Sequence, residues 1–595
     1  MSEKNTQFNK LYQTKPVLSF LFGCAAGFIC FLIIYGIKIL DFTNIDWLLH
    51  SDDLEGSLDL TQHYLGWCFY RRSPWSFPIG LTEGLYSDPV SVIYSDSIPL
   101  FAIFFKIISP LLPANFQYFG LFGAMCYALT GGFSCFLFRR LTELHPSLTG
   151  FCPVFDLMAS CIVVCNPVLL NRMFLHTALS AHFLIIAGFC IAMYDKELSS
   201  LKSLLLWTLL ICVSALINAY FVPMIFGTYF FVLLYRLLNK QDRFVLSLVK
   251  AAVPICLCLF VCFAAGMFYG SVPAKDGGLT ALSVNLNGLF NPHTYLSAYG
   301  KYTLGYNDIN YSRILPDMSL VTPYQNEGFC YLGLGIILLF AFLFCMLIYS
   351  LITKAGKGNA EKSQRIPFKV SLTVFIIVFF LLALSPAWTL GSNTLFTIPL
   401  PRIITDLWSM FRSTGRFIWP VYYLLIIGSM YYVKMKFFTK KATLYVFIAA
   451  IALIQAFDLS PGIFMKRAAF RDIPEYESSL VSEEWDELAE GKSRIVFYPP
   501  TFTGLYLDKE TNMDFLIYAL KHDLSLNNSY LSRDLTSQAD KKTLAEFEER
   551  KEGKRFPDTI YVFFERMDNY EMPDPDMYGL EYRNIDGRRV AVDAE

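Results

Sequence analysis

The sequence predicts an α-helical polytopic membrane protein that carries a C-terminal extracytoplasmic α/β domain. Hydrophobic residues make up 54% of the 595 residues and charged residues only 17%. This is too little charge to cover the surface of a water-soluble protein of this size. The apolar residues also form blocks of about 20 residues, the length that crosses a hydrocarbon core of about 30 Å. After residue 458 the composition becomes more polar.

Charge and cysteine content exclude some classes of protein. The net charge of -1 gives no sign of a nucleic-acid partner or of general capture of an anionic polymer. Most of the 15 cysteines, such as Cys161 and Cys258, lie inside apolar segments, and residues 459–595 contain none. No Cys/His spacing fits a zinc site. We therefore interpret the cysteines as small hydrophobic residues of membrane helices.

The first apolar block, Val17 to Leu40, predicts a transmembrane helix that is retained in the mature protein. The polar segment before it carries Lys4, Lys10 and Lys15. The block is too long for a signal-peptide core and lacks a small-residue cleavage site. We expect the N-terminus to lie on the cytoplasmic side.

About eleven apolar segments are long enough to be predicted as membrane spans. They are residues 17–40, 116–138, 154–171, 178–195, 203–219, 220–238, 248–269, 329–352, 370–386, 416–434 and 442–457. The stretch 98–112 is also apolar, but it is short, contains Lys106 and is closed by Pro110 and Pro113. We expect an interfacial or re-entrant helix there rather than a span.

Basic residues predict the orientation of these spans. With the N-terminus inside, every predicted cytoplasmic connection is short and basic, as is typical of cytoplasmic loops. The basic groups are Arg139/Arg140, Lys196/Lys202, Arg236/Lys240/Arg243, the run from Lys354 through Lys369, and Lys434/Lys436/Lys440/Lys441. A full span at 98–112 would reverse the orientation of every later span and move these basic groups to the outer side. The opposite side then receives long loops at about 41–97, 270–328 and 387–415.

The chain is thus predicted to consist of a membrane domain, residues 1–458, and a soluble domain, residues 459–595. The soluble part has helix-like stretches around 479–490, 511–522 and 535–549 and strand-like runs at Arg494–Tyr498, Thr559–Phe564 and Arg588–Val592. Asp586-Gly587 is a turn signal before the last strand. We expect a small α/β domain that rests on the membrane surface.

The first predicted outer loop gathers acidic and aromatic side chains just beyond a membrane helix. Asp52, Asp53, Asp59 and Asp96 are its candidate acids. Aromatic residues such as Trp67 accompany them. These aromatic residues are typical either of an interfacial belt or of a wall that contacts a sugar ring. The acids are either solvated loop residues or part of an active site.

The same loop resembles a known class of enzyme. The residues that carry the resemblance are Asp59-Leu-Thr-Gln-His63, Gly66-Trp67, Arg71, Pro74-Trp75, Pro78, Gly80 and Ser95-Asp96-Ser97-Ile-Pro-Leu. This pattern resembles a bacterial GT-C-like family of undefined function, over most of the chain. GT-C glycosyltransferases are multi-span proteins with one or two acids in the first outer loop. The resemblance implies that Asp59 acts as base toward an acceptor hydroxyl or helps to hold a metal, with Asp52/Asp53 as the alternative.

Arg172 and His176 form a second candidate group, where a predicted span ends on the outer side. They are four residues apart, so they share one face of a helix. Ionisable groups in or near a membrane are costly and point to function. We predict that they contact the phosphate of a lipid-linked donor; the alternative is a polar network that packs helices.

Glu327, Arg412 and Arg416 are the third group. Glu327 opens a predicted span, where a carboxylate also complements the helix dipole; the resemblance implies that it orients acceptor or metal. The two arginines enter the membrane from the outer side, against the positive-inside tendency. Their guanidinium groups suit bidentate binding of phosphate, and snorkelling to lipid headgroups is the alternative. Gln455 and Asp458 are weaker candidates that we expect to be structural.

Together these groups lead to the hypothesis of an inverting glycosyltransferase that uses a polyprenyl-phosphate sugar donor. Its predicted catalytic residues are Asp59, Asp96 and Glu327, and its predicted substrate-binding residues are His63, Trp67, Arg172, His176, Arg412 and Arg416. Such a reaction needs a base for the acceptor hydroxyl and cationic groups, or a metal, for the phosphate leaving group. The sequence leaves open whether Mg²⁺ or Mn²⁺ takes part and which glycan, lipid or protein is the acceptor. The family resemblance implies the bacterial plasma membrane.

Two other functions stay open at this point. A transporter or flippase of lipid-linked glycans would also need basic and aromatic residues, but it should carry polar groups to the cytoplasmic ends of its spans, and here the inner halves look mostly apolar. No internal repeat supports it either. A non-catalytic envelope assembly protein is the third reading; it predicts that Asp59→Asn is silent whereas removal of residues 470–595 is not.

Overall fold

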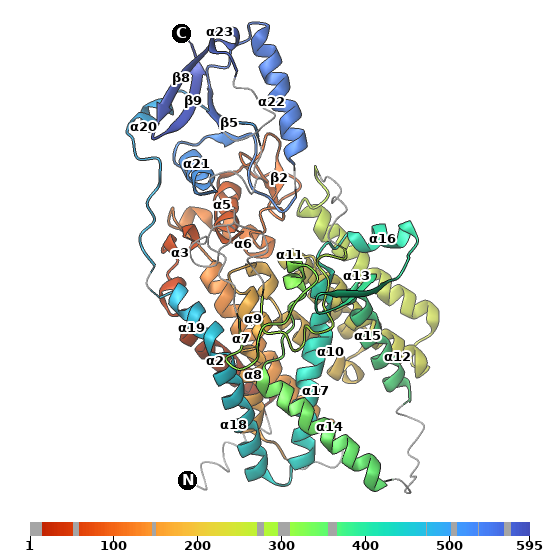
Figure 1. Ribbon diagram of the computed structural model, residues 1–595. Coiled ribbons are helices and arrows are strands. Elements are labelled where there is room, and N and C mark those ends of the chain that lie inside the picture. Colours follow the sequence, from red (N-terminus) through yellow and green to blue (C-terminus); the bar gives the residue numbers. More distant parts are fainter. Residues whose placement is uncertain are drawn as a thin grey trace.

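The chain is mostly helical, with a small sheet in its C-terminal part (Figure 1). The computed structural model describes residues 15–50, 59–145, 150–270, 279–294, 310–354, 366–471, 473–500, 509–533, 535–564 and 573–594. Within this part of the chain, 8 helices are long and apolar enough to cross a membrane. They are α2 (Pro16–Tyr35), α7 (Phe119–Glu143), α10 (Phe183–Tyr194) with its flanking turns, α11 (Ser200–Ile217), α12 (Phe221–Leu238), α13 (Phe244–Ala264), α15 (Ile366–Leu384) and α18 (Lys441–Asp458).

The three remaining predicted spans also coincide with helices. They are α8 (Pro153–Val164), α14 (Leu334–Lys354) and α17 (Trp419–Phe437). Helix α8 has only 12 residues, the part of α14 whose side chains are described ends at Ser350, and α17 has Lys434 and Lys436 in its last turn. The mostly helical class with several candidate membrane spans is therefore confirmed, whereas the number eleven stays a prediction.

The predicted span 154–171 is interrupted. Helix α8 ends at Val164 and a new helix, α9 (Pro167–Arg172), begins with Asn166 as its N-cap. The Asn166 side chain accepts a hydrogen bond from the backbone N–H of Leu169 at 3.0 Å. Pro167 has no N–H to donate to the preceding turn, and the Asn166 cap starts a new helix there, so both residues favour the break. The break places Arg172 at the end of a separate short helix.

The stretch predicted as a short interfacial or re-entrant helix is indeed too short to span a bilayer. It forms α6 (Pro99–Ile107), which is followed by a single turn, Ser109–Leu111. Lys106 of α6 is buried, with its ammonium group 4.0 Å from the centre of the Tyr70 ring and 4.7 Å from that of Trp75. Cation–π contacts of this kind compensate part of the cost of burying the charge.

The first predicted outer loop contains a buried helix that sequence reasoning missed. Helix α5 (Asp59–Arg72) lies between the membrane helices and the C-terminal domain (Figure 1). Side chains from Leu60 to Trp67 are buried on every face of it. Because hydrophobic and polar residues are buried alike, the 3.6-residue alternation that reveals a surface helix is absent.

The C-terminal part contains a five-stranded mixed sheet of order β6-β5-β7-β9-β8. Strand β5 (Arg494–Tyr498) pairs in parallel with β6 (Ser525–Leu526) and β7 (Thr559–Phe563), whereas β9 (Arg588–Asp593) pairs antiparallel with β7 and with β8 (Leu580–Ile585). The predicted strands coincide with β5, β7 and β9, and Asp586-Gly587 forms the predicted turn, between β8 and β9. Strands β6 and β8 were not predicted. Among the helices, α20 (Glu484–Leu488) is shorter than predicted, and α21 (Lys509–Lys521) and α22 (Thr536–Lys551) agree.

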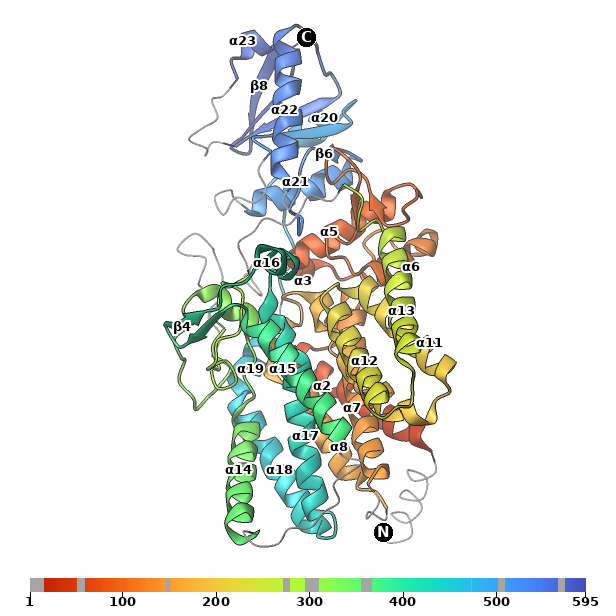
Figure 2. The same cartoon turned by 90° about the vertical axis from the view of Figure 1, so that its right-hand side faces the viewer.

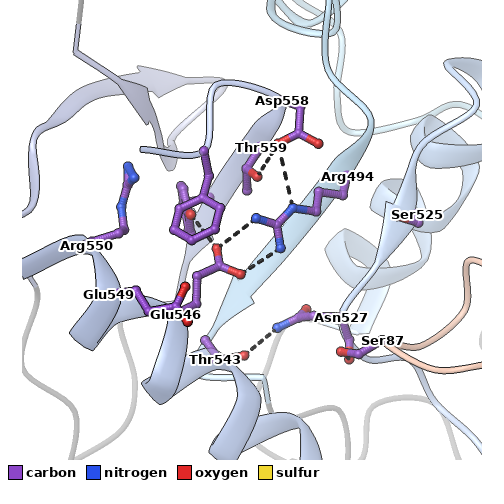
Figure 3. Close-up of polar contacts among 12 residues, drawn as sticks. Ser87, Arg494, Ser525, Asn527, Thr543, Glu546, Glu549, Arg550, Asp558 and Thr559 are labelled. Atoms are coloured by element: carbon purple, nitrogen blue, oxygen red, sulfur yellow. Dashed lines mark hydrogen bonds and ion pairs between the residues drawn. The ribbon is translucent and has the colours of Figure 1, made fainter. Parts of the chain in front are cut away.

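Charged contacts fix α22 against this sheet (Figure 3). Glu546 of α22 accepts hydrogen bonds from two nitrogens of Arg494 in β5, at 2.6 and 3.1 Å. Thr543 accepts another from Asn527, at 3.0 Å. The bidentate arginine–carboxylate geometry is the stronger kind of ion pair. We interpret this polar cluster as structural.

Buried charges also lie at the far ends of the helices. Arg416 marks one end of α17, and these charges lie at the other end. Lys434 of α17 and Asp156 of α8 pair at 2.5 Å with both side chains 0% exposed. Arg236 and Asp195 pair at 2.5 Å between α12 and the end of α10. Two of these residues, Arg236 and Lys434, belong to the basic groups that the sequence places in cytoplasmic connections, so the prediction of mostly apolar inner halves stays a prediction. A buried charge persists in such a place only when it is paired.

Candidate functional site

The candidate site begins with two acids of the first outer loop and one histidine of α5. Asp59 is the first residue of α5, and His63 follows one turn later, on the same face. Asp96, which lies in the chain just before α6, approaches His63 with 3.8 Å between Asp96 Oδ2 and His63 Nε2. Asn218, at the end of α11, donates to the other carboxylate oxygen of Asp96 at 3.4 Å.

The loop that carries Asp96 is pressed against α5. Gly66 makes this possible, because a Cβ at that position would lie 2.3 Å from the Cβ of Ser95. The hydroxyl of Ser97 donates to the backbone carbonyl of His63 at 2.7 Å. Asp96 and Ile98 adopt left-handed backbone conformations, with φ of 53° and 54°. For a β-branched residue such as Ile98 this conformation is strained, and strain of this kind gathers at functional sites.

Asp59 connects three distant parts of the sequence. His176 Nε2 lies 3.2 Å from Asp59 Oδ2, and the hydroxyl of Tyr530, from the C-terminal domain, donates to Asp59 Oδ1 at 3.1 Å. The acid therefore lies at the meeting point of α5, the segment between α9 and α10, and the C-terminal domain.

Glu327 holds two arginines on the other side of the site. It belongs to a 3₁₀ helix, η6 (Pro323–Gly328), and its Oε2 lies 3.0 Å from Nη2 of Arg172 and 2.8 Å from Nε of Arg416. Arg416 belongs to a second 3₁₀ helix, η7 (Thr414–Ile418), directly before α17. The two turns approach so closely that only glycine fits at position 415: a Cβ there would lie 2.6 Å from the Cα of Gly328.

Aromatic rings flank the two guanidinium groups. The Arg416 guanidinium lies 4.4 Å from the centre of the Tyr220 ring, and that of Arg172 lies 5.8 Å from the centre of the Trp419 ring. The Nε of Arg172 and the indole N–H of Trp419 are buried without a hydrogen-bond partner among the described residues. Buried donors without a partner are uncommon, and they mark places where water or a ligand binds.

The acids and the arginines lie within range of one another's charges. Asp59 and Arg416 both act on the ionisation of Asp96, and Glu327, Arg172, Arg416 and His63 all act on that of His176. The side chains of Asp59, Asp96 and His176 stay 19%, 24% and 24% exposed, whereas that of Arg172 is 3% exposed. Solvent therefore reaches the acids and His176 rather than the arginine behind them.

Burial sets the charges of the first-loop groups. Burial, helped by the nearby charge of Asp59, raises the pKa of Asp96 to about 7. Burial lowers the pKa of His63 to about 3, so this imidazole is neutral at neutral pH. The contact between His63 and Asp96 is therefore not an ion pair, although its distance satisfies an ion-pair criterion.

Glu327 behaves in the opposite way. Burial acts to raise its pKa, but Arg172 and Arg416 outweigh burial and hold the pKa of this carboxyl well below its usual range. Burial lowers the pKa of His176 well below its ordinary value. The site thus combines a permanently charged Glu327–arginine cluster with one acid, Asp96, that changes its protonation state near neutral pH.

The structure brings together most of the predicted site residues. Asp59, His63, Asp96, Arg172, His176, Glu327 and Arg416 all belong to this cluster. Trp67 does not face it: its side chain is fully buried and its indole N–H donates to the carbonyl of Phe116 at 3.0 Å. Arg412 is exposed and forms no ion pair with a described residue. Asp52 and Asp53 lie outside the described residues.

Sequence reasoning missed three members of the site, and two weaker candidates lie outside it. Asn218, Tyr220 and Tyr530 come from segments far from the acids, and no spacing in the sequence signals them. Asp458 is buried and accepts hydrogen bonds from the Tyr331 hydroxyl at 2.7 Å and the Leu334 N–H at 2.9 Å. Gln455 donates to the Leu332 carbonyl at 2.9 Å. These hydrogen bonds hold the start of α14 against the end of α18, which agrees with a structural role for both residues.

No group of three or more His, Cys, Asp or Glu side chains that could hold a metal ion occurs in the described part of the chain. The acids of the site are instead surrounded by histidine, asparagine, tyrosine and arginine. These side chains can deprotonate a hydroxyl, donate hydrogen bonds and bind an anionic group.

Fold and site together define a mostly helical protein with 8 candidate membrane spans among its described residues and an acid- and arginine-rich site where its helices meet a C-terminal α/β sheet. The chain belongs to the family described as "Domain of unknown function (DUF6311)", which matches residues 24–460. The "DUF6311 C-terminal domain" matches residues 484–593. A comparison with curated proteins finds no match.

Proposed function

We propose that this chain is a membrane glycosyltransferase of the GT-C type. It transfers a sugar from a polyprenyl-phosphate donor to a glycan, lipid or protein acceptor on the extracytoplasmic face of a bacterial plasma membrane. The observation that carries the proposal is the meeting of two solvent-accessible acids, Asp59 and Asp96, with two buried arginines, Arg172 and Arg416. This is the pairing that transfer from a lipid phosphate to a hydroxyl requires.

The acids take the proton of the acceptor hydroxyl. Asp59 is held by His176 and Tyr530 and is the base of the proposal. Asp96 assists it, because a pKa of about 7 lets this carboxyl take up and release a proton near neutral pH. The accessible fractions of both side chains leave them in reach of an acceptor.

The arginines hold the donor phosphate. Glu327 fixes both guanidinium groups from one side and thereby orients their other N–H groups. In this proposal Glu327 positions the arginines rather than acting as a base, since its carboxyl stays ionised. The unpartnered N–H groups of Arg172 and Trp419 add hydrogen bonds to the departing phosphate.

A flippase of lipid-linked glycans is the second candidate. The buried ion pairs Lys434–Asp156 and Arg236–Asp195 give the bundle charged groups at the ends opposite to the site, as a transport path would need. Purified chain in vesicles separates the two functions. A glycosyltransferase yields a new glycosidic product from donor and acceptor on one side, whereas a flippase moves intact donor across the bilayer.

The proposal is tested by comparing cell-envelope glycans from strains that make the native chain, Asp59→Asn, Arg416→Ala or Arg412→Ala. We expect one specific sugar decoration to disappear with Asp59→Asn and Arg416→Ala at unchanged protein level. It should persist with Arg412→Ala, because this exposed arginine lies outside the cluster. Unchanged glycans in a deletion strain would refute the enzyme. A silent Asp59→Asn, together with loss of function on removal of residues 470–595, would favour the assembly protein.

A further inference from the structure

The segment 387–410 exposes apolar side chains beside the site. It consists of a hairpin, β3 (Ala387–Leu390) and β4 (Asn393–Thr397), and of helix α16 (Arg402–Ser409). All five residues of β4 are exposed, and α16 has no buried residue. The exposed apolar residues are Leu390, Leu395, Phe396, Ile398, Ile403, Ile404, Leu407 and Met410. A patch of this kind on a protein surface marks a place of contact with a partner or a lipid.

Helix α16 is amphipathic. Ile403, Ile404 and Leu407 recur at the spacing of one helical face, with Ile403 70% and Leu407 64% exposed. Thr405 and Asp406 lie on the other face. A short helix with one apolar face and one polar face suits the boundary between water and acyl chains.

The exposed residues continue the surface of a membrane span. Strand β3 begins three residues after α15 ends at Leu384. The N–H of Ile398 donates to the carbonyl of Pro386 at 2.9 Å, which returns the chain to the end of that span. Figure 2 shows β4 at the rim of the molecule and α16 beside the end of α15. The apolar segment therefore lies beside the end of α15, a candidate membrane span.

Charge at both ends of α16 complements lipid phosphates. Arg402, at its first position, is 90% exposed at its side chain, and its only ion pair among the described residues is the long 3.8 Å contact with Asp406. Arg412 is exposed just beyond the end of α16. Arginine side chains that flank an apolar helix face place their charge among headgroups while the helix lies in the interface.

The same segment is bound tightly to the site. Asn285 and Gly391 exchange hydrogen bonds of 2.9 and 3.0 Å. Gln325, two residues before Glu327, donates to the Thr389 hydroxyl at 2.8 Å. Six residues after Met410 the chain reaches Arg416 itself. The segment is therefore hydrogen-bonded to a residue two positions before Glu327, and it precedes Arg416 by six residues along the chain.

We propose that segment 387–410 lies in the bilayer interface on the side of the site, with the exposed apolar side chains of β4 and the apolar face of α16 in contact with phospholipid. Arg402 and Arg412 contact the phosphates of this leaflet. The bilayer at this edge then adjoins the Glu327–Arg416 pair, and a lipid with a charged headgroup can reach the arginines laterally. The proposal goes beyond glycosyl transfer and does not require it.

Spin-label accessibility tests this proposal. Leu407→Cys, Phe396→Cys and the matched control Asp406→Cys each receive a nitroxide in the full chain, reconstituted in phosphatidylcholine–phosphatidylglycerol vesicles. The unsubstituted chain supplies the background from its 15 native cysteines. All three positions are exposed, and the one ring contact that the substitutions remove is that of Phe396 with Trp388, 5.1 Å between ring centres.

We expect the labels at 407 and 396 to be relaxed more strongly by oxygen, which dissolves in the acyl region, than by a water-soluble nickel chelate. The label at 406 should show the reverse order. Equal nickel accessibility at all three positions would place the segment in water and overturn the proposal. Low accessibility to both reagents, with spin–spin broadening, would overturn it in favour of contact with a second copy of the chain.

Discussion

Asp96 concentrates the unusual features of the site in one residue. Its backbone is left-handed, its loop is pressed onto α5 at Gly66, and burial raises its pKa to about 7. The sequence marks Asp96 only as one acid among several, because neither backbone conformation nor desolvation is visible in a motif. The Ser95-Asp96-Ser97 pattern led to the prediction that this acid assists Asp59, and the structure places Asp96 beside His63, one turn after Asp59 in α5.

The raised pKa of Asp96 makes stability depend on pH. The folded chain binds this proton more tightly than the unfolded chain, so the contribution of Asp96 to stability is full at low pH and is lost as the pH rises through about 7. Asp96→Asn cannot titrate. We expect the unfolding free energy of this variant, relative to the native chain, to increase between pH 5 and pH 8 by about 2.6 kcal/mol, since almost two pKa units are lost at about 1.4 kcal/mol each.

Thermal unfolding of the detergent-purified proteins at both pH values measures this difference. Asp406→Asn, which changes an exposed acid on α16, is the control and should follow the native chain at both pH values. A constant difference between Asp96→Asn and the native chain would show that Asp96 ionises as an ordinary surface acid.

The other site residues show what a sequence can and cannot reveal. Arg416 and Arg412 have the same type and the same motif, yet only Arg416 pairs with Glu327. The difference comes from the close contact of Gly415 with Gly328, which lies almost 90 residues away along the chain. Aromatic residues occur both in packed cores and in binding sites, where they contact sugar rings, so Trp67 was predicted as a substrate contact. The structure shows its side chain packed in the core.

At the scale of elements, hydropathy predicted the long helices and missed the irregular ones. Eight predicted spans coincide with helices of full length, because twenty apolar residues in a row need no tertiary contact to be recognised. The break between α8 and α9 and the buried helix α5 depend on local capping and on burial of polar side chains. Neither leaves a hydropathy signal. In the C-terminal domain, β5, β7 and β9 were predicted from alternation and a turn signal.

Helix α5 also docks the C-terminal domain. Its last residue, Arg72, donates to the carbonyls of Ala519 and Leu524 at the end of α21, and the Leu526 N–H donates to the carbonyl of Gly84 at 2.8 Å. Charged hydrogen bonds to several carbonyls are worth about 1.5–3 kcal/mol each. This docking holds Tyr530 close enough to donate to Asp59.

We therefore expect Arg72→Ala to loosen the C-terminal domain. Amide hydrogen exchange in residues 519–526 should become at least about ten-fold faster, the factor that corresponds to about 1.4 kcal/mol. The matched control is Arg71→Ala, since Arg71 binds the carbonyls of Leu112 and Pro113 instead. If both variants accelerated exchange equally, or neither did, the α5 contact would not be what docks the domain.

At the scale of the whole molecule, the site exists only because three regions meet. The first outer loop supplies the acids, the turns before α10, α14 and α17 supply the histidine, Glu327 and Arg416, and the C-terminal domain supplies Tyr530. The sequence predicted that these regions share one side of the membrane, and the structure brings their side chains together. The orientation of that side and the reaction stay predictions, since the family carries no assigned function.

Binding of a polyprenyl phosphate to the purified chain tests the central claim most directly. We predict that Arg416→Ala weakens binding about ten-fold or more. The loss of a charged hydrogen bond between a buried arginine and the phosphate costs at least about 1.5 kcal/mol of binding free energy. Arg412→Ala, four residues earlier, should bind like the native chain. Native mass spectrometry of the three proteins in matched detergent gives the affinities. Equal binding by Arg416→Ala and the native chain would contradict the assignment of this cluster as a lipid-phosphate site.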